Sequence, residues 1–442
     1  MKIPFLETKI ETDLLLTLGL TPLWWLLGLN VMIYQVIGLL VLLKLFVWSF
    51  YSDSPLSIPR PLLGLFFFMV IYLTSLLFNF GNHPLQRIIA SANNYLMFVM
   101  GFCLMLTVYN AAAPGFPRRF FAAGNRLALI TAGIALFFLG AWWVLKWTFR
   151  MEPLLAHLWP GLKNYPFFYI QWVIQGVTLD WKIGNMPRIS VYSGVPIATG
   201  GFMAMILPLS MGFQRLKESR RWVSAGIFMV LLVPFFFSLS RTAVCALLAA
   251  WLAVKLIEIG IKPFWCFFYF CVFFPLVDRL YLAFQWLLSI RPDSTWGRLG
   301  IYKEAFSQVM EQNPLLGLGA RPRDEFSTMI VGSHSHYVEI LLVTGILGLG
   351  AFLAFQIFML FSWFSQKKYL LTEEHRTLWR YLGISHLTAD AVLLTSGLDS
   401  IPLTAFMYFL VAGVILYLGK EIKLFYVLQK NTKQEQDHAL AL

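Results

Sequence analysis

Residues 400–419, SIPLTAFMYFLVAGVILYLG, form a stretch without a single charged side chain. A helix needs about 20 predominantly apolar residues to cross the roughly 30 Å hydrocarbon core of a bilayer. This stretch therefore predicts a transmembrane helix. Similar runs recur along the whole chain of 442 residues, of which 59% are apolar and 13% are charged, with a mean hydropathy of +0.70. Such a composition excludes an ordinary soluble globular domain.

About twelve runs satisfy the same length criterion, with short polar segments between them. The sequence predicts an all-α integral membrane bundle that forms a single polytopic domain over residues 1–442. An even number of spans places both termini on the same side of the membrane. The predicted spans lie near residues 13–29, 31–50, 61–80, 94–111, 126–147, 191–213, 222–239, 242–258, 264–288, 336–363, 379–397 and 400–419.

Basic residues decide the orientation, because Lys and Arg in short loops are retained in the cytoplasm. Most of them fall on the side that carries the termini, so we expect both termini to be cytoplasmic. The net charge of +12 then reflects topology and attraction to anionic lipid, and nucleic acid is not expected as a partner. The basic residues on this side are Lys2, Lys9, Arg60, Arg118, Arg119, Arg126, Arg215, Lys217, Arg220, Arg221, Lys262, Lys367, Lys368, Arg376, Arg380, Lys420, Lys423 and Lys430.

Two long loops, residues 148–190 and 289–335, fall on the opposite, extracytoplasmic side. Loops of this length are uncommon unless they carry a function. Seven aromatic residues in the first loop are typical of a segment in the membrane interface, and stacking on sugars is the alternative. They are Trp159, Tyr165, Phe167, Phe168, Tyr169, Trp172 and Trp181.

The second loop and the span after it, residues 289–350, contain the sequence SIRPDSTWGRLGIYKEAFSQVMEQNPLLGLGARPRDEFSTMIVGSHSHYVEILLVTGILGLG. Its first part predicts a helix that ends at Asn313 and Pro314. The glycines of the following Gly317-Leu318-Gly319 turn allow left-handed backbone angles and the close approach of a ligand. Two histidines then precede the tenth span.

Residues 298–348 resemble the C-terminal signature of the O-antigen ligase and lipid-linked repeat polymerase family. In that signature an Arg-bearing helix leads to NPLLGLG, then to a histidine and a helix that ends in GxxG. Arg188, and the dipeptide Ser240-Arg241 at the outer end of the eighth span, also resemble the family.

The essential histidine of the family is followed at fixed distances by Tyr, Glu and Gly. Counting back from Tyr337, Glu339 and Gly345 assigns this position to His334, and His336 is the alternative. The family commonly has Asn after the histidine, where this chain has Ser335. A hydroxyl and an amide both orient an imidazole, so the departure puts only the identity of that partner in doubt.

The resemblance implies a glycosyltransferase that acts on an undecaprenyl-pyrophosphate-linked glycan at the outer face of the bacterial inner membrane. Its chemistry needs cations for a diphosphate leaving group and a base for an acceptor hydroxyl. Arginine binds phosphate oxygens bidentately and stays charged, while histidine titrates near neutrality. The expected pyrophosphate-binding residues are Arg188, Arg241, Arg298 and Arg321, and the expected catalytic residues are His334 and His336.

No metal and no other cofactor is expected, because the four cysteines lie inside predicted spans without the CxxC spacing of a zinc site. The expected partners are the lipid-linked glycan donor, a glycan or lipid A-core acceptor and membrane lipid. The resemblance also allows for a chain-length regulator protein as a partner. Asp390 within the eleventh predicted span, and Asp399 beside the outer end of that span, are candidate partners for the arginines.

The segment with PRD after the glycines and GSHS before the tenth span resembles polymerases of O-antigen or exopolysaccharide more than ligases, and this resemblance implies polymerisation of repeat units. An O-antigen ligase that transfers the glycan to lipid A-core is the alternative. A twelve-span secondary transporter is a remote alternative, since it would show paired repeats with broken helices and charges at the membrane midplane.

Overall fold

The computed structural model describes residues 4–51, 55–160, 174–180, 186–193, 195–260, 292–322, 335–397 and 402–441. Its α-helices are α1 (Pro4–Gly19), α2 (Thr21–Leu27), α3 (Ile33–Tyr51), α4 (Arg60–Phe78), α5 (Leu85–Ala111), α6 (Phe116–Leu145), α7 (Leu154–Leu158), α9 (Pro196–Leu216), α10 (Arg221–Phe237), α11 (Arg241–Glu258), α14 (Pro292–Gln312), α15 (His336–Ser365), α16 (Glu373–Leu393) and α17 (Pro402–Ala441). Short 3-10 helices are η1 (Leu29–Val31), η2 (Phe80–Asn82) and η4 (Gln366–Tyr369), and the strands are β1 (Arg150–Met151), β2 (Ile174–Gln175), β3 (Val177–Asp180) and β4 (Met186–Ile189).

Seven helices in the described part of the chain are long and apolar enough to cross a membrane, namely α3, α4, α5, α6, α9, α15 and α17. A further pair, α1 and α2, is bent by 58° and counts as an eighth span if it crosses as one unit. The chain is thus an α-helical integral membrane protein. The count of twelve spans stays a prediction, and the expected span 264–288 lies outside the described residues.

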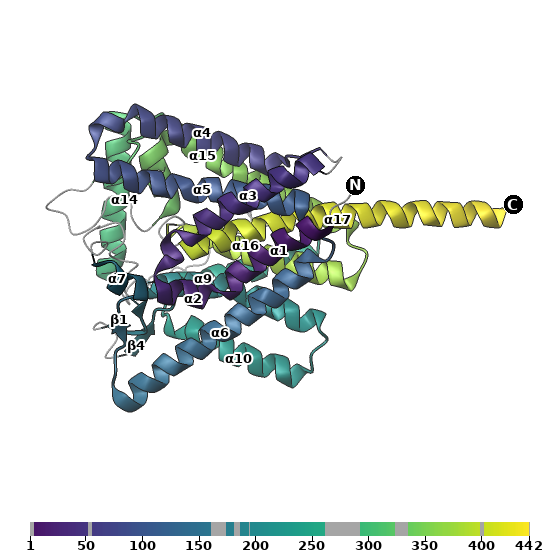
Figure 1. Ribbon diagram of the computed structural model, residues 1–442, viewed down its shortest axis with the longest axis horizontal. Helices are drawn as coiled ribbons and strands as arrows, with labels where there is room; N and C mark the ends of the chain where they lie inside the picture. Colours follow the sequence, from purple (N-terminus) through teal and green to yellow (C-terminus); the bar gives the residue numbers. More distant parts are fainter. Residues whose placement is uncertain are drawn as a thin grey trace, which may run out of the picture.

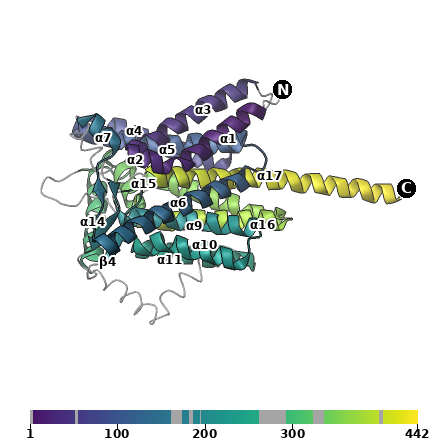
Figure 2. The same ribbon diagram turned by 60° about the horizontal axis from the view of Figure 1, so that its bottom comes forward.

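Most of the long helices run roughly along the long axis of the molecule, whereas α14 runs across it (Figures 1 and 2). Helix α1 begins and α17 ends at one end of the bundle, which we call the terminal end. Helices α14 and α7 and the strands lie at the opposite end, which we call the loop end. The sequence predicts this grouping of the termini away from the two long loops.

Helix α17 contains most of the apolar stretch 400–419. Residues 402–418 are all buried, and the helix packs against α5, α15 and α16. A helix that is apolar on every face belongs in the centre of a bundle rather than at its surface. The polar remainder of α17 extends beyond the bundle at the terminal end (Figure 1).

The strands form two small antiparallel sheets within the first long loop. Strand β1 pairs with β2, with Arg150 opposite Gln175. Strand β3 pairs with β4, with Thr178 opposite Arg188. The second pairing places Arg188 on a strand at the loop end.

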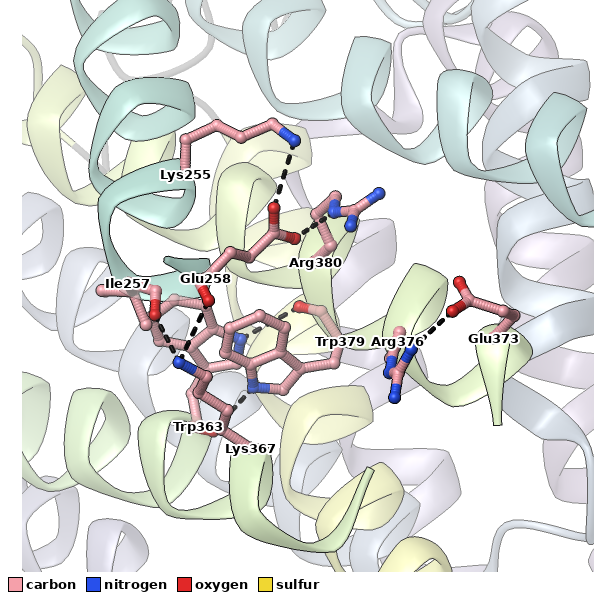
Figure 3. A network of polar contacts seen from close by, with 9 residues as sticks. All are labelled: Lys255, Ile257, Glu258, Trp363, Lys367, Glu373, Arg376, Trp379 and Arg380. Atoms are coloured by element: carbon pink, nitrogen blue, oxygen red, sulfur yellow. Dashed lines mark hydrogen bonds and ion pairs between the residues drawn. The ribbon is translucent and has the colours of Figure 1, made fainter. Parts of the chain in front are cut away.

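At the terminal end, the last residue of α11 joins three helical elements (Figure 3). The carboxylate of Glu258 forms an ion pair with Arg380 of α16 and lies 3.1 Å from Nζ of Lys255. Lys367 of η4 donates hydrogen bonds to the main-chain carbonyls of Ile257 and Glu258. Cations at the C-terminus of a helix satisfy carbonyls that have no partner within it.

Two tryptophans, Trp363 of α15 and Trp379 of α16, lie next to these contacts (Figure 3). The rings of Trp363 and Trp379 are stacked, with centroids 4.7 Å apart. Each indole N–H donates to the main-chain carbonyl of the other residue, at 3.0 and 2.9 Å. The pair satisfies two buried donors and fixes α15 against α16.

Candidate active site

Helix α15 is broken near its start. Gly345 has φ 66° and ψ −167°, backbone angles that only glycine adopts readily, and it divides α15 into segments 336–344 and 346–365. The hydroxyl of Tyr337 donates to Oε1 of Gln356 at 3.0 Å. A straight helix would separate these residues by about 28 Å along its axis. The first segment therefore folds back along the second, so the helix of the predicted span 336–363 is interrupted at Gly345.

The NPLLGLG sequence fills this break. Interrupted helices leave N–H and C=O groups without partners inside the helix. The N–H groups of residues 318 and 319 donate to the carbonyls of 342 and 343 at 2.9 Å. In turn, the N–H groups of residues 346 and 347 donate to the carbonyls of 314 and 315 at 2.9 and 3.3 Å. The turn caps the end of one helical segment and the start of the next.

Glycines are required where these backbones meet. Gly317 and Gly319 have φ values of 68° and 73°, which confirms the predicted left-handed angles. A Cβ atom on Gly317 would lie 2.5 Å from the nitrogen of Gly345, and one on Gly345 would lie 2.3 Å from the carbonyl oxygen of Leu315. The close approach that these glycines permit here is that of the protein's own backbone. Approach of a ligand to the turn stays a prediction.

Polar side chains of α4, α5 and the segment between them hold the turn from the other side. They donate hydrogen bonds of 2.7–3.2 Å to the carbonyls of residues 317–319 and 343. Nothing in the local sequence of these helices points to residues more than two hundred positions away, so these contacts were not predicted. The four side chains are Ser75, Asn79, His83 and Ser91.

A buried charged cluster lies between the turn and the start of α15. The guanidinium group of Arg321 forms an ion pair with the carboxylate of Glu339. Nδ1 of His336 lies 3.7 Å from Oε2 of the same carboxylate. Only 1% of His336 and 4% of Glu339 are exposed. Burying charges is costly unless they are paired, so Glu339 determines where Arg321 sits.

Aromatic rings fix the imidazole of His336. It stacks on Phe98 of α5, with centroids 5.7 Å apart and planes at 15°. Phe352 of the second α15 segment meets it edge-on at 5.3 Å. Because only 1% of His336 is exposed, its imidazole is not accessible to an acceptor sugar in this conformation.

A polar network continues from Tyr337 into the bundle. The carboxylate of Asp390 on α16 accepts hydrogen bonds from Gln356 at 3.3 Å and from Tyr408 of α17 at 2.9 Å. Nε2 of His386 lies 3.6 Å from its second oxygen. Asp390 thus joins α15, α16 and α17, where the sequence predicted a partner for an arginine. Asp399 lies outside the described residues.

A second group of predicted residues lies at the corner between α10 and α11. Arg188 of β4 donates from Nε and Nη2 to the carbonyl of Ser238 at 3.3 and 3.1 Å. Ser240 caps α11 by accepting from the N–H of Ala243, and Arg241 is the first residue of that helix. Burial lowers the pKa of Arg188 from its usual value. Arginine is effectively always protonated in proteins, so the guanidinium stays positively charged at neutral pH.

The structure therefore gathers Arg321 with His336, and Arg188 with the corner that carries Arg241. Arg298 belongs to α14 at the loop end, but its side chain lies outside the described residues, as does the whole of His334. Glu339 is the site residue that sequence reasoning used only as a motif marker. Its spacing of three from His336 places both on one face of a helix, and this signal was sufficient to find the pair.

Within the described ranges, no group of three or more His, Cys, Asp or Glu side chains is arranged to hold a metal ion. Residues 189–353 match the family model described as O-antigen ligase. No curated protein matches the chain. The matched range begins one residue after Arg188 and includes Arg241, α14, the NPLLGLG turn and the broken start of α15. The segment of this chain that is similar to the O-antigen ligase family, residues 189–353, therefore contains every predicted site residue except Arg188.

Proposed function

We propose that this protein transfers a glycan from an undecaprenyl-pyrophosphate carrier to an acceptor hydroxyl at the loop end of the bundle. The observation that carries the proposal is the Arg321–Glu339 ion pair. Arg321 precedes residues 323–334 and Glu339 follows them, so the pair joins the two chain segments that flank this range. The range includes His334, the residue that matches the family histidine.

His334 is the proposed base. It directly precedes Ser335, whose hydroxyl accepts from the N–H of Val338 and caps the 336–344 segment. The N-terminus of a helix carries partial positive charge, which disfavours protonation of a nearby imidazole. A neutral imidazole is the form that accepts a proton.

His336 is the proposed positioning residue of the two histidines. It is buried between Phe98 and Phe352 and faces the carboxylate of Glu339. Arg321 is assigned the same kind of role, because its guanidinium is paired with Glu339. Together they hold the start of α15 against the NPLLGLG turn.

Arg188, Arg241 and Arg298 are the proposed ligands of the pyrophosphate. Arg188 contacts the corner of α10 and α11, Arg241 begins α11 at the same corner, and Arg298 belongs to α14 at the same end of the bundle. Guanidinium groups bind phosphate oxygens in a bidentate fashion and stabilise the charge that develops on a leaving diphosphate.

In the proposed reaction the acceptor oxygen forms a bond to the anomeric carbon of the donor sugar. The bond between that carbon and the pyrophosphate oxygen breaks, and its electron pair stays with the diphosphate. The acceptor proton passes to His334. No oxidant, reductant or metal ion is needed for this balance, and the arginines compensate the charge of the leaving group.

The broken helix α15 does not indicate a transporter. Broken helices in transporters line substrate sites at the midplane. The break in α15 is instead filled by residues 314–319, which bond to the ends of both segments.

Polymerisation of O-antigen or exopolysaccharide repeat units at the periplasmic face of the bacterial inner membrane is the proposed activity. Purified protein supplied with a lipid-linked repeat unit alone tests it. A ladder of longer lipid-linked products is the expected result. Absence of products until lipid A-core is added would identify the alternative, an O-antigen ligase, and absence of products under both conditions would contradict the proposal.

A further inference from the structure

A cavity of about 800 Å³ opens at the terminal end of the bundle, away from the proposed active site. Residues of α6, α9, α10 and α16 line it, and this volume lies within the range of small-molecule sites. Its lining extends along α10 from Arg221 to Leu231, which spans about 15 Å of helix. The cavity is therefore elongated along the helices.

The deep part of the cavity is apolar on one side and neutral on the other. Ile227, Phe228 and Leu231 of α10 form the apolar wall. On the α9 side, Ser210 and Gln214 donate to Oδ1 of Asn125 at 2.6 and 3.1 Å, so their polar groups are already used. A hydrocarbon chain fits this part better than a charged group does.

The mouth of the cavity carries charges of both signs on opposite elements. Arg215 and Arg221 lie at the end of α9 and the start of α10, and Glu373 and Glu374 lie in the first turn of α16. Glu374 is 3.9 Å from Arg118 of α6. Glu218 also lines the cavity on the α9–α10 side, and Glu373 forms an ion pair with Arg376 at 2.6 Å. A ligand in the mouth would thus meet guanidinium groups mainly on the α9–α10 side and would share the α16 carboxylates with Arg118 and Arg376.

The mouth also lies at the level of a membrane surface. Trp222, next to Arg221, is 89% exposed, and tryptophans concentrate at the boundary between hydrocarbon and water. Helix α10 lies at the edge of the bundle (Figure 1), so this wall of the cavity borders the bilayer.

We infer that this cavity binds a phospholipid whose head group contains both a phosphate and a primary ammonium group. The phosphate is placed between Arg215 and Arg221, the ammonium group toward Glu373 and Glu374, and one acyl chain along Ile227, Phe228 and Leu231. Arginine recognises phosphate through charge-assisted hydrogen bonds. The carboxylates distinguish this head group from an anionic one, which has no cation to offer them.

Native mass spectrometry of the full-length protein in detergent tests the assignment. Phosphatidylethanolamine and phosphatidylglycerol with identical acyl chains are added separately and together, and the retained lipid is counted. The expected result is preferential retention of phosphatidylethanolamine. Equal retention of both lipids by the parent protein would overturn the assignment of the head group.

Paired variants separate the two halves of the site. Arg215→Gln/Arg221→Gln is expected to weaken retention of both lipids about tenfold. Glu373→Gln/Glu374→Gln is expected to abolish the preference for phosphatidylethanolamine while phosphatidylglycerol is retained. Arg60→Gln/Lys430→Gln removes two exposed cations at the same end and is expected to change nothing. Retention by the arginine variant equal to that of the parent would overturn the proposal.

Soluble O-phosphoethanolamine distinguishes a membrane lipid from a free head group. If the apolar wall contributes to binding, soluble O-phosphoethanolamine displaces the lipid only at concentrations at least about a hundredfold above that of the lipid. Displacement at equal concentration would contradict a lipid as the occupant. Unfolding midpoints measured without added lipid identify any variant that is merely misfolded. Phe228→Ala, which removes part of the apolar wall and leaves the charges unchanged, then gives a second test by weaker retention of both lipids.

Discussion

Glu339 is the residue whose environment says most about the proposed active site. It is almost fully buried, it neutralises Arg321, and it faces His336. Removing one partner of a buried ion pair typically costs about 3–5 kcal/mol, because the remaining charge is left uncompensated. Replacing both partners by apolar residues of similar volume is often neutral for stability. These two outcomes separate the contribution of the pair to folding from its contribution to activity.

Glu339→Gln is expected to lower both the thermal midpoint and the rate of glycan transfer, because Arg321 and His336 lose the carboxylate that they face. Arg321→Met/Glu339→Leu is expected to recover the midpoint but not the rate, since the flanks of residues 323–334 are then no longer joined by charge. Thermal unfolding in detergent and a transfer assay measure the two effects. Full activity of the double variant would show that the ion pair does not position the site.

At the scale of single elements, the broken helix α15 is the feature that brings the site together. Its first segment returns along the second, and the NPLLGLG turn caps both. The break depends on Gly345, which combines a backbone conformation specific to glycine with contact to the carbonyl of Leu315. A Cβ atom at this position would meet the backbone of Leu315 and Gly317, so that backbone has to move to make room for a side chain.

Gly345→Ala is expected to destabilise the protein by more than about 1–3 kcal/mol, the usual cost of backbone strain, because the added Cβ also meets the Leu315 carbonyl. Gly350→Ala is the matched control. Gly350 lies on the same helix with open space around it, and alanine favours a helix over glycine by up to about 1 kcal/mol. The thermal midpoints of the two variants should therefore move in opposite directions, or the control should not move. Equal midpoints for parent and Gly345→Ala would contradict the broken helix.

The Glu258 contacts at the terminal end connect α11 with α16 and η4, and they lie outside the proposed active site. Glu258→Ala removes the partner of Arg380 and is expected to cost about 1–3 kcal/mol of stability, as for hydrogen bonds to charged groups. The rate of transfer per folded molecule should be unchanged, because the proposed site lies at the loop end. Lys255→Ala, in which a half-exposed cation is lost, should cost less than about 1 kcal/mol. A lower transfer rate per folded molecule in Glu258→Ala would contradict this expectation and would show that the terminal end affects the proposed site at the loop end.

At the scale of the whole molecule, hydropathy was sufficient to predict a helical membrane protein. The apolar stretch 400–419 forms the buried part of α17, and the helix predicted before Asn313 is α14. The order of the elements also predicted that the termini and the long loops lie at opposite ends. These features depend on length and apolar composition, which are local properties of the sequence.

The break in α15 was not predicted, because residues 336–363 are continuously apolar apart from a few polar positions. The break arises from Gly345 together with a turn about thirty residues earlier. The contacts of Ser75, Asn79 and Ser91 with that turn are equally non-local. Periodicity carries no information about such pairings, whereas the Arg321, Glu339 and His336 cluster had a partial signal in the spacing of its last two members.

The proposed chemistry requires no divalent ion at any step, because arginines compensate the diphosphate charge and an imidazole accepts the proton. Transfer by purified protein dialysed against EDTA is therefore expected to proceed at the rate of the untreated protein, measured as product formed per minute. A loss of activity that Mg²⁺ or Mn²⁺ restores would contradict a metal-independent mechanism.

Binding of the lipid-linked glycan and its transfer, measured side by side on His334→Ala, test the proposed mechanism most directly. The variant is expected to bind the glycan donor like the parent protein, because the arginines are untouched, and to lose about 10²–10⁴-fold in transfer rate. Arg241→Ala should instead weaken binding as well as transfer, and Arg241→Lys should restore only part of both. Transfer by His334→Ala at the rate of the parent protein would contradict His334 as the base.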